Sequence, residues 1–80
     1  MSTKATDTLS DATVAAARKQ ADAVQLPESR DALLAMHRRA RQRRDAAPLM
    51  SEARAEAAFE IERIEIQIAR VERAMDPPLV

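Results

Sequence analysis

Apolar residues in the second half of the chain alternate at spacings of four and three residues. They are Ala57, Ile61, Ile64, Ile68, Val71 and Met75. This alternation places them on one face of a helix and is typical of a coiled-coil seam. It predicts a helix over about residues 49–75, which ends before Pro77 and Pro78 because proline cannot continue a helix.

A thinner apolar face precedes this helix. Its members are Leu33, Met36 and Ala40, flanked by Ser29 and Ala47. They predict a helix over about residues 27–45, with Pro27 in its first turn, and Pro48 and Ser51 are both able to start the following helix. Two helices joined by so short a linker favour an all-α, antiparallel, coiled-coil-like hairpin in which the two apolar faces form one seam.

The segment before the hairpin predicts little tertiary structure. Residues 1–9 are small and polar and favour disorder. Residues 10–24 favour a helix, with Ser10 as a candidate N-cap, but their apolar positions are mostly alanine, so we expect them to bury little. The expected organisation is a disordered to weakly helical arm over 1–25, a helical hairpin over 26–76 and a proline-rich tail over 77–80.

The composition excludes most kinds of site chemistry. The 80 residues contain no Cys and no Gly, and His37 is the only histidine. No disulfide, thiolate metal site or glycine-rich phosphate loop can form from such a sequence. A lone histidine supplies neither a nucleophile–base pair nor a set of metal ligands. We therefore expect no enzyme activity, no cofactor, no metal and no small-molecule substrate.

The small size of the chain points to self-association. Below about 70–80 residues a single core rarely contributes more than ~3–5 kcal/mol, so small folds usually need a further constraint. With disulfides and metals excluded, a homo-oligomer is the constraint that remains. The chain shows neither the apolar stretch of a signal peptide nor a run long enough for a membrane span. We therefore expect a cytoplasmic protein without a membrane partner.

Three apolar residues do not fit the seam. Phe59 and Ile66 are seven residues apart and lie nearly opposite it, and Leu34 points away from Leu33 and Met36. A hairpin that hides one seam would leave Leu34, Phe59 and Ile66 exposed. Aligned exposed apolar residues indicate an interface. They predict a second interface, for another copy of the chain or for a helix of a different protein.

The octamer HRRARQRR, residues 37–44, holds five arginines in a chain of zero net charge. In an antiparallel hairpin its basic end lies beside the acidic start of the second helix. The residues expected to form ion pairs across the hairpin are Arg43, Arg44, Glu52, Glu56 and Glu60. We expect Arg44 near Glu52, and either His37 or Arg41 near Glu56 or Glu60. Exposed pairs contribute only about 0.2–1 kcal/mol each, but they fix register and orientation.

Three arginines of the octamer face away from the seam. Arg38, Arg39 and Arg41 are candidates for contact with phosphate, with an acidic protein or with the next copy of the chain. The octamer has no interleaved aromatic residues to stack on bases. Any nucleic-acid binding should therefore be directed at the backbone and sensitive to salt.

The order of these elements resembles a known family. The first arm is LPESRDALLAMHRRARQRRDAAPLM and the second is SEARAEAAFEIERIEIQIARVERAM, which together cover residues 26–75. This arrangement is similar to the oligomerisation hairpin of phage-type small terminases, which form rings that help to load DNA into a packaging motor. The resemblance implies sequence-independent DNA contacts by Arg38, Arg39 and Arg41 and a docking tail in DPPLV. Residues 1–25 are too few for the helix-turn-helix domain common in that family.

These observations lead to one functional hypothesis and two alternatives. The first is a non-enzymatic, oligomeric assembly or adaptor subunit that acts through its helical hairpin, with a protein partner. The second is a DNA-packaging subunit that contacts the phosphate backbone through the arginines. The third is a small regulator that binds the helices of another protein.

Overall fold

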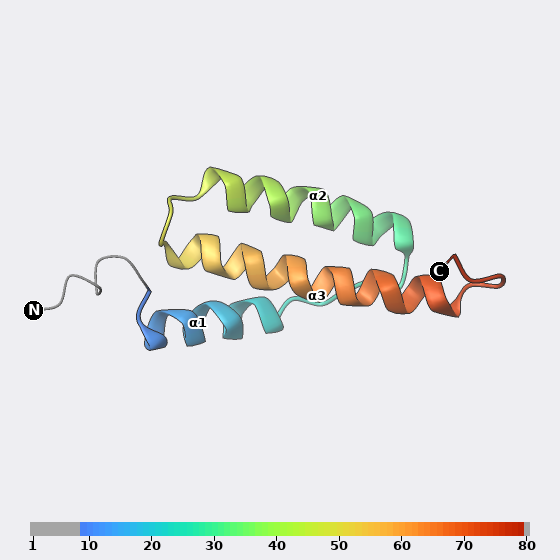
Figure 1. Ribbon diagram of the computed structural model, residues 1–80, viewed down its shortest axis with the longest axis horizontal. Coiled ribbons are helices and arrows are strands. Elements are labelled where there is room, and N and C mark those ends of the chain that lie inside the picture. The colour runs from blue at the N-terminus through green and yellow to red at the C-terminus, as the bar shows by residue number, and fades with distance from the viewer. Residues whose placement is uncertain (1–8, 80) are drawn as a thin grey trace, which may run out of the picture.

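The computed structural model describes residues 9–79, and they form three helices (Figure 1). These are α1 (Asp11–Asp22), α2 (Arg30–Ala46) and α3 (Glu52–Ala74). The central helix is α3, which contacts α2 along one side and α1 along another, whereas α1 and α2 do not contact each other. As Figure 1 shows, α2 runs antiparallel to α3 and α1 runs parallel to it. The prediction of an all-α fold built on an antiparallel hairpin is confirmed.

Each helix begins at a serine. The hydroxyls of Ser10, Ser29 and Ser51 accept hydrogen bonds from the backbone N–H groups three residues ahead, at 3.1, 3.2 and 3.1 Å. Such N-caps satisfy donors that the helix itself leaves unpaired. The expected start of α2 at Pro27 is wrong, because the cap at Ser29 places the first helical residue at Arg30.

The core lies between α2 and α3, where the seam was predicted. Leu33, Ala40, Ile61 and Ile64 are buried together, and Leu26, Met36, Ile68 and Val71 pack against them. Ala57 is also buried. Met75 departs from the predicted seam: its side chain is 39% exposed, because the backbone leaves the helix there in an extended conformation.

The helix α1 buries more than its alanine-rich sequence suggests. Ala17 and Ala21 are completely buried, so the expectation that this segment would bury little is wrong. Methyl side chains let two helix backbones approach closely, and the distance between packed helices depends on the side chains at the contact. The alanines of α1 thus favour close packing on α3. Residues 1–8 of the predicted arm and Val80 of the tail lie outside the described residues.

Candidate interaction surface

One ion pair of the hairpin has a buried carboxylate and a half-exposed arginine. Glu60 of α3 is only 4% exposed, and the Arg43 guanidinium of α2 donates to both of its carboxylate oxygens, with Nη1 to Oε2 at 3.4 Å. A carboxylate held by two guanidinium nitrogens is a strong, geometrically specific pair. Arg43 and Glu60 both belong to the set expected to form ion pairs across the hairpin, and their contact has the geometry needed to fix α2 against α3.

The other expected pairs have different partners. Arg44 binds Asp45, its neighbour on α2, at 3.0 Å and not Glu52, which is exposed. His37 Nε2 lies 2.9 Å from an oxygen of Glu65, later along α3 than the expected Glu56 or Glu60. The reason is the connection between the helices: it spans residues 47–51, longer than the sequence pattern indicates. Each residue of α2 therefore faces a later residue of α3.

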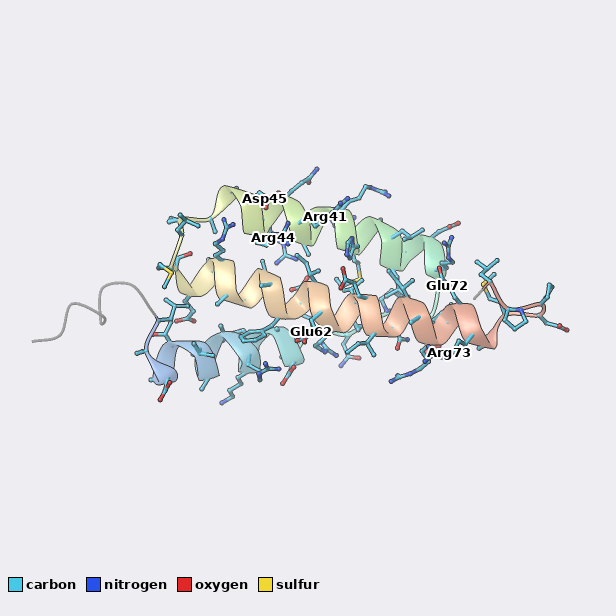
Figure 2. All side chains as sticks on the ribbon, viewed as in Figure 1. Arg41, Arg44, Asp45, Glu62, Glu72 and Arg73 are labelled. Carbon is cyan, nitrogen blue, oxygen red and sulfur yellow. The ribbon has the colours of Figure 1, made fainter. Side chains whose placement is uncertain are left out.

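Three arginines that the sequence did not single out tie the helices together. Arg30 at the start of α2 binds Glu72 of α3, with 2.7 Å between Arg30 Nε and Glu72 Oε2; Glu72 is labelled in Figure 2. Arg54 Nη1 donates to the carbonyls of Arg44 and Ala47 at 2.9 and 3.3 Å, at the end of α2. Arg63 Nη1 donates to the carbonyls of Ala21 and Val24 at 2.6 and 2.8 Å, at the end of α1. Positively charged side chains stabilise the C-terminal ends of helices, where carbonyl groups lack partners. Arg54 and Arg63 belong to a different helix from the ends that they contact, so the spacing of residues in the sequence could not predict these contacts.

The hydrogen bonds from Arg63 to the end of α1 should stabilise α1 against local unfolding. We expect Arg63→Met to raise the hydrogen-exchange rates of α1 by about 10- to 100-fold, because hydrogen bonds from a charged donor contribute about 1.5–3 kcal/mol each. The rates of α2 and α3 should stay unchanged. Arg73→Met on the same helix is the matched control, and equal acceleration in both variants would show that Arg63 does not hold α1.

The three residues of the predicted second interface do not lie together on one exposed surface. Phe59 is half-buried, and the guanidinium carbon of Arg18 in α1 lies 4.0 Å from the centre of its ring. Such a cation–π contact contributes about 0.5–1 kcal/mol at an exposed site. Leu34 is half-buried on α2, and Ile66 is 55% exposed on α3. The apolar face opposite the seam is thus partly covered by α1 of the same chain.

The outward arginines of α2 have no acidic partner. Arg38, Arg39 and Arg41, together called the α2 arginine patch, are all exposed, and none forms an ion pair with any residue in the range 9–79. Figure 2 labels Arg41 beside Arg44 and Asp45 toward the end of α2. The arginines that do have a polar or aromatic partner are Arg18, Arg30, Arg43, Arg44, Arg54, Arg63 and Arg70. The patch is therefore the main unneutralised positive region of α2.

The connection between α2 and α3 exposes two large apolar residues. Leu49 is 76% exposed and Met50 is 46% exposed; we call this pair the apolar turn. Met50 has a φ of 62°, in the left-handed region that costs a non-glycine residue about 1–2 kcal/mol. The turn borders a shallow groove of about 220 Å³ that is also lined by Leu9, Arg44, Ser51, Arg54, Ala55 and Ala58. Sequence reasoning missed this site, although two adjacent large apolar residues in a polar linker were a visible signal.

Comparison of the chain with protein-family models, with curated proteins and with solved structures found no match. The resemblance to small terminases thus rests on the sequence pattern alone. Among residues 9–79, no cluster of three or more His, Asp or Glu side chains is placed to hold a metal ion. Within the same range, no helix has both the length and the apolar character needed to cross a membrane.

Proposed function

We propose that this chain is a non-enzymatic assembly or adaptor subunit that binds an acidic protein surface. The contact surface is the α2 arginine patch together with the apolar turn. The observation that carries the proposal is the contrast within α2: the arginines that face α3 form ion pairs, and those that face outward form none with residues 9–79. Partners with carboxylates would supply the missing negative charge.

The chemistry of this surface favours a protein over nucleic acid. Protein interfaces combine a desolvated apolar centre with arginines, whereas binding to a phosphate backbone needs no exposed aliphatic residues. Leu49 and Met50 supply such an apolar centre. Full burial of one large apolar side chain contributes about 1.5–3 kcal/mol, so docking of the turn in a groove of the partner would contribute favourably to the free energy of binding.

Photocrosslinking at the turn tests this function. With p-benzoylphenylalanine in place of Leu49 in cells that make the protein, we expect discrete adducts to another protein, or to a second copy if the assembly is homo-oligomeric. Changing the whole α2 arginine patch to alanine in the same chain should remove these adducts and leave the helical circular dichroism unchanged. The matched control carries the crosslinker in place of Lys19, an exposed residue of α1, and should give none. Adducts that persist without the patch would exclude it as the contact surface.

The second candidate function is binding to a nucleic-acid backbone, favoured by the terminase-like pattern and by three guanidinium groups that form no ion pair with the described residues. If three phosphates are contacted, raising the salt from about 50 to 200 mM should weaken binding by about 40-fold. Fluorescence anisotropy of a labelled DNA duplex measures this directly. Saturable, salt-sensitive binding that is lost on changing the patch to alanine would make this function the better one.

A further inference from the structure

A small cavity lies where the linker between α1 and α2 passes beside α3. Its volume is about 210 Å³, and it is lined by Leu26, Arg63, Ile66, Gln67 and Arg70. Two of these side chains are aliphatic and two carry guanidinium groups. The cavity therefore offers positive charge and apolar surface within one site, and it shares no residue with the α2 arginine patch or the apolar turn.

Both arginines of the cavity donate hydrogen bonds to the protein, Arg63 two and the exposed Arg70 one. Arg70 Nη1 donates to Gln67 Oε1 at 3.2 Å, and Gln67 Nε2 donates to the carbonyl of Pro27 at 3.4 Å. Gln67 is only 9% exposed, so its orientation is fixed by its surroundings. Arg63 is anchored by its two carbonyl contacts at the end of α1. Because a guanidinium has five N–H donors, both groups keep donors for a ligand.

The charge of the cavity is only weakly neutralised by the protein. The nearest carboxylate to Arg63 is that of Asp22, with 3.9 Å between Arg63 Nε and Asp22 Oδ1, and the Asp22 side chain is 57% exposed. Arg70 forms no ion pair with any residue among 9–79. The planar guanidinium groups of Arg63, which has only this long contact with an exposed carboxylate, and of Arg70 match the geometry of a carboxylate ligand.

We propose that this cavity binds a carboxylate that carries a branched aliphatic group. Arg63 and Arg70 bind the carboxylate, and Leu26 and Ile66 contact the aliphatic part. The volume is below the ~300–1,000 Å³ of sites for drug-sized ligands and suits a ligand the size of one amino acid. A free aliphatic acid and the C-terminal residue of a peptide both have this chemistry. Such a ligand would also cover Ile66, which neither the core nor the proposed function uses.

The test is titration of the ¹⁵N-labelled full chain, followed by amide chemical shifts. The probes are 4-methylpentanoate, for a free acid, and N-acetyl-leucine, for a peptide C-terminus. The control compounds are the amides of these two acids, which lack the negative charge, and acetate, which lacks the branched aliphatic group. The variants are Arg70→Gln and Ile66→Ala. Arg73→Gln is the matched control, because Arg73 is an exposed arginine of α3 outside the cavity.

We expect saturable shifts around Leu26 and Ile66 with the acids and at least about tenfold weaker binding of the amides and of acetate, because charge and aliphatic contact both contribute. Arg70→Gln and Ile66→Ala should each weaken binding, and Arg73→Gln should not. Tighter binding of N-acetyl-leucine identifies a peptide C-terminus as the source; equal or tighter binding of 4-methylpentanoate identifies a free acid. Equal binding of acids and amides, shifts confined to the α2 arginine patch, or no shifts at tens of millimolar would overturn the proposal. None of these results depends on the photocrosslinking outcome.

Discussion

Replacing Ile64 by alanine should destabilise the protein strongly, as should the same change at Leu33. Ile64 and Leu33 are the largest fully buried side chains among residues 9–79. Isoleucine-to-alanine changes in a core cost about 2–5 kcal/mol, because apolar contacts are lost and a cavity remains. A core of this size contributes little more than that in total, about 3–5 kcal/mol. Thermal denaturation followed by circular dichroism should therefore show a variant that is largely unfolded at physiological temperature.

The matched control is Ile66→Ala, the same change two residues later on the same helix. Ile66 is 55% exposed, so its truncation should alter the free energy of unfolding by no more than about 0.5 kcal/mol. Equal destabilisation by both changes would mean that Ile66 is buried in solution. Concentration-dependent melting of the parent chain, absent in Ile66→Ala, would then assign that burial to self-association.

Replacing Arg43 by methionine should give a smaller but clearly measurable loss of stability. The change leaves the buried carboxylate of Glu60 without its counter-ion, and breaking a buried pair in this way costs about 3–5 kcal/mol. Arg43 itself is 51% exposed, so water reaches the site and we expect a smaller loss, about 1–3 kcal/mol. Chemical denaturation followed by circular dichroism measures the difference.

Two further variants distinguish the effect of the unpaired Glu60 charge from the effect of lost side-chain packing. Arg41→Met removes an unpaired, exposed arginine of the same helix and should be neutral within about 0.5 kcal/mol. Combining Arg43→Met with Glu60→Leu removes both charges, and buried pairs replaced by apolar residues are often neutral. The double variant should therefore recover most of the lost stability. A double variant as unstable as Arg43→Met would show that the contact does not act through charge.

These expectations assign two roles to the arginines of the octamer. Arg43 is used to fix α2 on α3, and its charge is neutralised in the fold. The α2 arginine patch contributes little to folding, because its side chains have no acidic partner among the described residues. Stability and binding can thus be changed independently on one helix, which makes the proposed function testable without unfolding the protein.

Those parts of the protein that depend on local chemistry were predictable from the amino-acid sequence. The alternating spacing of Ile61, Ile64 and Ile68 required one long amphipathic helix, and the caps at Ser10 and Ser51 are local hydrogen bonds within a few residues. Helix periodicity fixes which side chains share a face, so the hairpin and most of its seam were predictable.

The residues that cover the other faces of α3 could not be predicted in this way, because they depend on how the helices pack. The docking of α1 onto Phe59, the capping of α1 by Arg63 and the pairing of His37 with Glu65 join residues far apart in the sequence. These contacts depend on the length and path of the two connections between the helices. A connection that is a few residues longer or shorter changes which residues of neighbouring helices face each other. The same packing leaves the α2 arginine patch exposed and without an ion pair to any residue of 9–79. Periodicity assigns a side chain to a face of its helix, but the arrangement of neighbouring helices determines whether that face meets protein or solvent.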